Sequence, residues 1–333
     1  MAGHLWMINR LRSVSDFPIR IIHRLSRIVN CVARALLCCY ATVVSRATVT
    51  TTTRTPRMTL EENCLFGEYR LRELISQGGI ASIWLATDKS GASFAIRVLH
   101  DTFSLTSTGP RLFRNGCAAL TVLPRHPNII PYISHNKING REYMLLEYVE
   151  GDNLRMLTLR SDPLLDELLS DLMLDMAAAI DHIHRHGWMH LDIKPENLIV
   201  SRAGHLMLCD FDTAVAIPNV PIRMDTKSGT PNYMPPEQLS GWPLDQRADI
   251  YSFGVTIYEL LTHGKPFEGR TPQEMLQNQL DSRYKIRSVR QFNPSVPVAL
   301  EEVILKCLAY LPERRYQSMS QVILGMNGAL GVR

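Results

Sequence analysis

The chain has 333 residues, of which 45% are hydrophobic and 20% are charged, and its formal net charge is +4. This length and hydrophobic content suffice for a packed domain of two lobes plus an extension. The seven cysteines show neither a paired framework nor metal-ligand spacing, which argues against a disulfide-based scaffold and favours a reducing compartment.

Positive charge is concentrated at the start of the chain. Residues 1–57 contain nine arginines and a single acid, Asp16, so they carry a net charge of +8 and leave −4 for the rest, against the total of +4. Residues 48–55 are threonine-rich and have the low complexity of a linker. We therefore expect a basic N-terminal extension at 1–57, a linker at 58–68 and a folded domain at 69–330.

Three interpretations of this extension stay open. Residues 28–44 are mostly apolar, but they are too short and too interrupted to predict a membrane span. The segment can lie on an anionic membrane surface, with Cys38 and Cys39 as acylation sites, and an arginine-rich, acid-poor start is also typical of a transit peptide. In the third interpretation the start is disordered or mis-assigned and Met58 is the true initiator, because it leads directly into the domain.

The first half of the domain is predicted to contain strands and one helix. Residues 69–71 and 75–83 indicate a strand, a glycine turn and a second strand, and residues 93–99 and 143–149 are apolar runs that predict further strands. A helix is expected at about 111–123. Gly116 lies inside it, and a helical glycine costs about 1 kcal/mol relative to alanine, so the sequence predicts a short or frayed helix.

Three stretches in the second half carry the chemistry. They are HLDIKPEN at residues 190–197, DFD at 210–212 and GTPNYMPPE at 229–237. Phosphoryl transfer demands little covalent work from the protein, so its site has to orient the acceptor hydroxyl, hold the metal and spread the phosphate charge. Asp192 can orient a hydroxyl, Lys194 can reach a phosphate, and Asp210 offers the hard carboxylate oxygen that Mg²⁺ prefers.

In order and spacing, these stretches resemble the catalytic loop, the magnesium-binding triplet and the end of the activation loop of the serine/threonine protein kinase family. The resemblance covers about residues 69–328. It implies an α+β fold with a small, mostly β lobe at about 69–147 and a larger, mostly α lobe at about 151–330. Lys194, two residues after Asp192, and Thr230 favour a Ser/Thr acceptor over tyrosine.

The resemblance also implies a site for ATP and Mg²⁺. Asp192 would accept or orient the hydroxyl proton, Lys194 would contact the γ-phosphate, and Asn197 and Asp210 would bind Mg²⁺. Gly78 would give the phosphate-covering turn its unusual dihedral angles. The expected ATP-binding residues, which include a gatekeeper (Leu146) and hinge positions (Glu147, Val149), are Ile75, Gly78, Ile83, Ala95, Arg97, Leu146, Glu147, Val149, Asp152, Ile199 and Asp210.

Several positions depart from the family pattern. A lysine is replaced by Arg97, its partner glutamate by Gly116, two glycines by Ser76 and Ala81, and the glycine of the triplet by Asp212. The sequence thus predicts a phosphate-positioning ion pair that is half altered and half missing. Two functions stay open: an Mg-ATP-dependent Ser/Thr kinase, and a pseudokinase that acts as a nucleotide-binding or scaffold module. For the enzyme, replacing Arg97 by lysine together with Gly116 by glutamate is expected to raise the rate.

Other matches predict structural support and partners. Asp249 resembles the aspartate that fixes the catalytic loop, and Arg315 resembles the arginine that pairs with Glu237. Leu191 stands where many of these kinases have arginine, so phosphorylation at Thr226, Ser228 or Thr230 is not expected to be obligatory. We expect a cytoplasmic protein that acts on a protein substrate, binds no nucleic acid and contacts an anionic membrane surface through residues 1–57. No oligomeric state is predicted.

Overall fold

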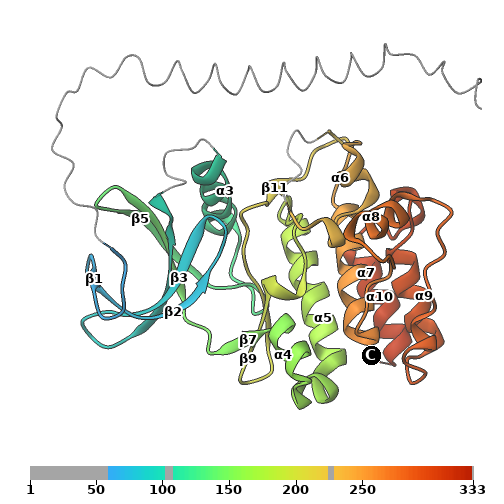
Figure 1. Ribbon diagram of the computed structural model, residues 1–333, viewed down its shortest axis with the longest axis horizontal. Coiled ribbons are helices and arrows are strands. Elements are labelled where there is room, and N and C mark those ends of the chain that lie inside the picture. Colours follow the sequence, from blue (N-terminus) through green and yellow to red (C-terminus); the bar gives the residue numbers. More distant parts are fainter. Residues whose placement is uncertain (1–58, 102–107, 224–228, 332–333) are drawn as a thin grey trace, which may run out of the picture. The chain divides into compact units, whose positions relative to one another are not determined.

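The computed structural model describes residues 59–101, 108–223 and 229–331 (Figure 1). The chain divides into two units, Met1–Thr59 and Leu60–Arg333, and every described helix and strand belongs to the second. The expectations for residues 1–57, Met58, Thr226 and Ser228 therefore lie outside the described residues. Within the described ranges, no helix combines the length and the apolar character needed to cross a membrane.

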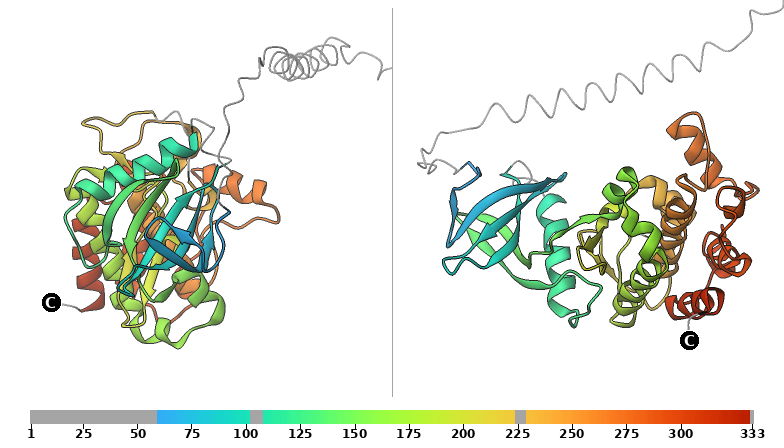
Figure 2. Two further views of the ribbon diagram at one scale, coloured as in Figure 1. Left: turned by 90° about the vertical axis from the view of Figure 1, so that its left-hand side faces the viewer. Right: turned by 90° about the horizontal axis from the view of Figure 1, so that it is seen from below.

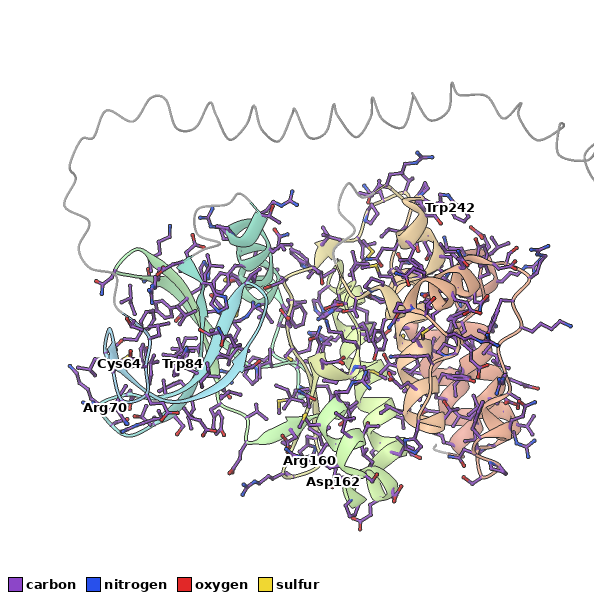
Figure 3. The ribbon with its side chains drawn as sticks, in the orientation of Figure 1. Cys64, Arg70, Trp84, Arg160, Asp162 and Trp242 are labelled. Carbon is purple, nitrogen blue, oxygen red and sulfur yellow. The ribbon has the colours of Figure 1, made fainter. Side chains whose placement is uncertain are left out.

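One antiparallel sheet forms the smaller lobe. Its strands, in sheet order, are β1 (Leu65–Phe66), β2 (Tyr69–Gln77), β3 (Ala81–Thr87), β4 (Ser93–Leu99), β6 (Arg141–Glu147) and β5 (Tyr132–Ile138). Trp84 on β3 is buried, and its indole N–H donates to the hydroxyl of Ser82 at 3.0 Å (Figure 3). The register sets Arg97 on β4 beside Ile83 on β3 and Met144 on β6, at the centre of the sheet.

Helix α3 (Thr108–Val122) packs against this sheet and contacts β4 and β5, as can be followed in the two views of Figure 2. The predicted short or frayed helix is wrong: α3 runs for 15 residues, and Gly116 is buried within it. Phe113, Cys117 and Leu120 are buried on the same helix. Their burial against the lobe outweighs the low helix propensity of one glycine, because tertiary packing supplies most helix stability in proteins.

The larger lobe is mostly helical. Its helices are α4 (Leu154–Arg160), α5 (Pro163–Arg185), α6 (Pro236–Ser240), α7 (Arg247–Thr262), α8 (Pro272–Leu280), α9 (Val298–Cys307) and α10 (Met319–Leu330), with 3₁₀ turns at Pro195–Asn197, Pro231–Tyr233, Val289–Gln291 and Pro312–Arg314. Short strands form two small sheets, β10 (Leu206–Leu208) with β9 (Leu198–Ser201) and β7 (Gly151–Asn153), and β11 (Val215–Ala216) with β8 (Trp188–Met189).

Local sequence explains how the long helices are placed. Asp162 caps α5 by accepting from the backbone N–H of Leu164 at 3.0 Å, and Pro163 fills the first helical position (Figure 3). Helix α7 is buried on nearly every side, which is typical of the central helix of a domain. The predicted α+β architecture of two lobes is confirmed.

A buried ion pair joins α6 to the end of the chain. Arg315 donates to Glu237 through Nη1 at 2.6 Å and Nη2 at 2.8 Å, and both side chains are almost fully buried. The same guanidinium donates to the backbone oxygens of Arg247, Ala309 and Tyr310. Only a planar fork can make this set of bonds, which explains arginine at this position.

We predict that Arg315→Leu lowers the free energy of unfolding by about 3–5 kcal/mol, because it leaves the Glu237 charge buried without a partner. Chemical denaturation of the full chain measures the change. Arg202→Ala is the control: Arg202 pairs with Glu150, but both side chains are largely exposed, so its loss costs about 0–1 kcal/mol. Equal effects of the two substitutions would contradict the prediction.

Candidate active site

Asp249, in the first turn of α7, anchors the loop at residues 190–197. Its two carboxylate oxygens accept from the backbone N–H groups of His190 and Leu191, each at 2.8 Å, and Nε2 of His184 lies 2.9 Å from Oδ2. Burial alone would raise the pKa of Asp249, but these bonds hold it below its ordinary value. They also hold Leu191 at a φ of 63°, a left-handed conformation that costs a leucine about 1–2 kcal/mol.

The loop brings together the side chains predicted for catalysis. Nζ of Lys194 donates to Oδ2 of Asp192 at 2.6 Å, and Nδ2 of Asn197 donates to the same oxygen at 3.0 Å. The hydroxyl of Thr230 donates to Oδ1 at 3.0 Å and accepts from Lys194 at 2.7 Å. Three side chains therefore fix one carboxylate, which stays at the edge of solvent with 9% of Asp192 exposed.

Gly229 lets the segment at 229–237 lie directly on this loop. Its φ of 121° falls in a region that glycine adopts readily and other residues do not. A Cβ atom here would lie 2.9 Å from the backbone oxygen of Leu191 and 2.9 Å from Cε of Met234. The absence of a side chain at 229 thus allows Thr230 to reach Asp192.

A cleft of about 480 Å³ opens beside the loop. Ten of the eleven residues predicted to bind ATP line it: Ile75, Ile83, Ala95, Arg97, Leu146, Glu147, Val149, Asp152, Ile199 and Asp210. The exception is Gly78. It lies in the turn between β2 and β3, where its N–H donates to the backbone oxygen of Ala81 at 2.9 Å.

The glycine turn does not have the predicted dihedral angles. Neither Gly78 nor Gly79 has a positive φ, so the expectation of unusual angles is wrong. The hydrogen bond from Gly78 to Ala81 closes the turn without a positive φ at either glycine. Ala81 is buried in the core of the lobe, which accounts for a residue with a side chain at that position.

Two of the lining carboxylates have partners outside the cleft. Asp152 accepts from Nη1 of Arg160 at 2.8 Å, and both side chains are about half exposed (Arg160, Figure 3). Glu147 accepts from Nη2 of Arg125 at 2.7 Å, and its backbone N–H donates to Pro131. Asp152 is therefore tied to α4, and both the carboxylate and the backbone N–H of Glu147 already have partners within the protein.

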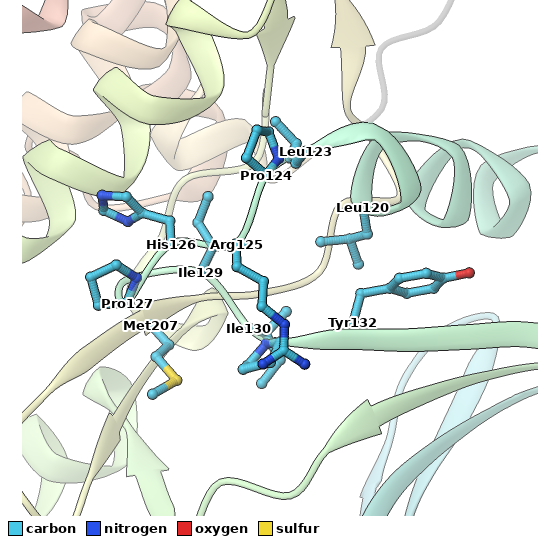
Figure 4. Close-up of a pocket in the computed structure, with 11 residues that line it drawn as sticks. Leu120, Leu123, Pro124, Arg125, His126, Pro127, Ile129, Ile130, Tyr132 and Met207 are labelled. Atoms are coloured by element: carbon cyan, nitrogen blue, oxygen red, sulfur yellow. The ribbon is translucent and has the colours of Figure 1, made fainter.

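A second hollow, of about 320 Å³, lies at the C-terminal end of α3 (Figure 4). Leu120 and Ile130 line both cavities, so these two side chains form a wall between them. Prolines and aliphatic side chains dominate the rest of the lining, and its ionisable members are Arg125, His126 and Tyr132. No carboxylate lines it, so the oxygen ligands that Mg²⁺ prefers lie in the larger cleft.

Asp210 fits the role of a magnesium ligand. Its Oδ1 is buried and accepts no hydrogen bond from any described residue, although Nη2 of Arg97 lies 3.3 Å away. Asn197 uses its amide nitrogen on Asp192, which leaves its amide oxygen as a second ligand. The described residues contain no group of three His, Cys, Asp or Glu side chains that could hold a metal, so nucleotide phosphates would have to complete the coordination.

Arg97 has a partner that the sequence did not predict. Nη1 and Nη2 donate to Oδ1 and Oδ2 of Asp212 at 2.5 and 2.6 Å, and about 10% of each side chain is exposed. A Cβ atom at Gly116 would lie 3.0 Å from Oδ1 of Asp212 and 3.3 Å from the carbonyl carbon of Phe211. The sequence predicted an ion pair with one member missing. The structure shows a complete pair instead, in which Asp212 is the partner of Arg97.

This geometry changes our expectation for a variant with lysine at 97 and glutamate at 116. A glutamate at 116 would enter the space beside Asp212 and place two carboxylates against one buried cation. With Asp212 present, we expect the double substitution to be slower than the parent.

Sequence reasoning missed other parts of the site. Met144, Asn153, Met156 and Glu196 also line the cleft and were not predicted, although Glu196 lies within the stretch at 190–197. Asp212 was counted as a defect of the triplet. One feature of the sequence could have indicated its role. The chain lacks the family's glutamate, at Gly116, and has an additional acid, Asp212, where the family has glycine.

The comparisons identify the family. The model of the protein kinase domain matches residues 69–324, so the chain belongs to this family, which uses ATP and Mg²⁺. It is 31% identical over 254 residues to the serine/threonine-protein kinase PrkC of Bacillus subtilis, covering 76% of this chain and 39% of that protein. It is 29% identical over 258 residues to the probable serine/threonine-protein kinase PknB of Lactococcus lactis, covering 77% and 41%. The predicted resemblance to serine/threonine protein kinases is confirmed.

Solved structures support the same fold. The kinase domain of PknI from Mycobacterium tuberculosis matches with a TM-score of 0.62 at 20% sequence identity, covering 81% of this chain and 100% of that one. At this identity the likeness shows the fold. The chain spans about two fifths of the length of the curated relatives named above.

We predict that Asp249→Asn lowers the free energy of unfolding by about 2–3 kcal/mol at pH 7, because an amide group would face a backbone N–H with another donor. The pKa of Asp249 is lower in the folded state than the unfolded value of about 3.9. Its contribution is therefore complete above that value and is lost as pH falls through the folded-state pKa. Denaturant titrations at several pH values should show parent and variant converging below about pH 4.

Asp281→Asn provides the matched control. Asp281 is a partly exposed acid that accepts from the exposed Arg283, so its substitution should shift the unfolding transition far less than Asp249→Asn does. A gap between the Asp249 variant and the parent that stays constant down to low pH would refute the role of the carboxylate charge.

Proposed function

We propose that this protein transfers the γ-phosphoryl group of Mg-ATP to serine or threonine hydroxyls of protein substrates. The observation that carries the proposal is the position of the Asp192 carboxylate, which Lys194, Asn197 and Thr230 fix by hydrogen bonds. The cleft beside it is lined by Asp210, whose Oδ1 accepts no hydrogen bond from a described residue. An acceptor hydroxyl, a positioned base and a metal ligand are the groups that phosphoryl transfer requires.

The roles follow from the contacts. The acceptor oxygen forms a bond to the γ-phosphorus while the bond from that phosphorus to the β–γ bridging oxygen breaks, and ADP leaves. Asp192 orients the hydroxyl and takes its proton. Lys194, already beside Asp192 and Thr230, balances negative charge on the transferred group. Mg²⁺ held by Asp210 and Asn197 would neutralise charge on the phosphates.

Several observations favour a Ser/Thr acceptor. Lys194 and Thr230 bond to each other and to Asp192, so both side chains lie beside the carboxylate that would orient the acceptor hydroxyl. The relatives named above are serine/threonine kinases by name. We assign the kinase domain to residues 69–330, with the smaller lobe at about 69–147 and the larger lobe at about 151–330.

The rival function is a nucleotide-binding scaffold without turnover. Its main support was the altered ion pair of the smaller lobe, and the contact of Arg97 with Asp212 removes that support. The groups that touch metal and acceptor are all present. We therefore prefer the enzyme.

Incubation of the full chain with radiolabelled Mg-ATP and a protein acceptor should label Ser and Thr. Asp192→Asn should lower the rate by about 10²–10⁴-fold, because it removes the base without altering the size of the side chain. Saturating Mg-ATP should raise the melting temperature of both proteins, since a ligand at a hundredfold excess over its Kd stabilises by about 2.7 kcal/mol. Nucleotide binding with equally low transfer by parent and variant would favour the scaffold.

We further propose that the basic extension at residues 1–57 attaches the protein to anionic membrane surfaces. Its net charge of +8 supports this, since each basic residue near such a surface contributes about 1 kcal/mol. The full chain should co-sediment with phosphatidylserine vesicles at low salt and be released at high salt. Arg→Gln changes at Arg20, Arg24, Arg27 and Arg34 should reduce this binding, whereas unchanged binding would exclude the electrostatic anchor.

A further inference from the structure

The phosphate-binding cation of the smaller lobe is held in an unusual way. Arg97, on the central strand β4, lines the cleft and binds the carboxylate of Asp212 with both Nη1 and Nη2 of its guanidinium. Burial alone would lower the pKa of Arg97, but the carboxylates of Asp212 and Asp210 raise it above its ordinary value. Each carboxylate oxygen of Asp212 accepts from one terminal nitrogen of the guanidinium, so the contact is bidentate.

We propose that Asp212 is a positioning residue that replaces the missing helix glutamate, so that the ionic partner of Arg97 comes from the triplet at 210–212 and not from α3. This inference rests on the proposed kinase function. It explains the departures at 97, 116 and 212 together, because all three follow from the replacement of one ion pair by another.

Side-chain shape explains arginine at 97. The short side chain of Asp212 presents its two oxygens side by side, and a planar fork can bond to both at once. A lysine would offer a single ammonium group and a single bonding direction. The ring of Phe113 on α3 lies 5.4 Å from Cζ of Arg97 and limits the guanidinium on another side.

Space explains glycine at 116. Any larger residue would bring a Cβ atom to 3.0 Å from the Asp212 carboxylate and 3.4 Å from its backbone nitrogen. Gly116 thus allows α3 to approach the triplet closely enough for Phe211 to be buried. A glutamate at 116 would therefore crowd Asp212, and its carboxylate would repel the carboxylate of Asp212.

The local charge explains why activity is compatible with the exchange. Arg97, Asp210 and Asp212 sum to −1. The arrangement that the sequence resembles, with lysine, helix glutamate and Asp210, also sums to −1. Binding of a divalent cation and phosphates therefore meets the same net charge in either arrangement.

Consequently, the position of Arg97 depends on the inward position of the triplet. Phe211 is 1% exposed and contacts the ring of His190 edge to face, with centroids 4.9 Å apart. Moving the triplet outward would break the contact of Arg97 with Asp212 and the one with Asp210 together. Loosening α3 would break neither contact.

The test compares Gly116→Glu in two backgrounds of the full chain. Alone, Gly116→Glu should lower kcat. Asp212→Gly should lower kcat by about a hundredfold, with a smaller change in the KM for ATP, because a displacement of about 1 Å costs this much in rate. Added to Asp212→Gly, Gly116→Glu should instead raise kcat, and the triple variant with Arg97→Lys should do the same. A residue with only a structural role would not reverse the sign of the effect.

Glu142→Gln serves as the matched control. Glu142 binds Arg114 and so ties α3 to β6 by an ion pair that lies outside the cleft. Its loss should leave kcat unchanged, because α3 supplies no ionic partner to Arg97. An unchanged kcat in Asp212→Gly, or the same effect of Gly116→Glu in both backgrounds, would overturn the proposal.

A measurement without catalysis separates this proposal from the proposed function. Unfolding of Arg97→Gln, Asp212→Asn and the double variant forms a cycle in which the double loss should be smaller than the sum of the single losses. If the parent transfers no phosphate but the cycle shows this coupling, the kinase function fails and the pair stands. Additive losses would refute the pair whatever the activity.

Discussion

The carboxylate of Asp249 joins the chemistry of this protein to its core. It is fully buried at the start of α7, and its oxygens accept from the backbone N–H groups of the loop that carries Asp192. A backbone held at two successive amides cannot rotate freely, which keeps Leu191 in a conformation that leucine avoids. The direction of Asp192 is thus set by a helix that is itself enclosed by the larger lobe.

Charge in this fold is buried mainly in compensated sets. Arg315 meets Glu237, Arg97 meets Asp212, and Glu259 accepts from Arg155, Lys265 and Tyr233. Removing one member of such a set leaves an unpaired charge, which costs more than the set contributes as a whole. These sets join segments that are far apart in the sequence. Their main effect is therefore to select one arrangement of helices and strands, and their net contribution to the free energy of unfolding is small.

The parts of the site that lie within one short loop could be predicted from sequence. Asp192, Lys194 and Asn197 occur within six positions, so their residue types and spacing nearly determine which atoms meet. Arg97 and Asp212 are 115 positions apart, and nothing in either strand or triplet indicates that they touch. Gly116 was judged by helix propensity, a property of one helix, whereas its cause is the space taken by another segment. The prediction of unusual dihedral angles in the glycine turn was wrong for a similar reason. Neither Gly78 nor Gly79 has a positive φ, and the next strand begins at Ala81, which is buried in the core.

Departures from a family pattern are usually counted as independent losses, and here that count misleads. Three altered positions argue for a dead enzyme if each removes a separate interaction. In this protein one ion pair instead takes the place of another, and a glycine makes room for the new carboxylate. The cation stays on the same central strand, lines the same cleft and keeps a carboxylate partner. The segment that holds the cation is different, and so is the motion that would release it.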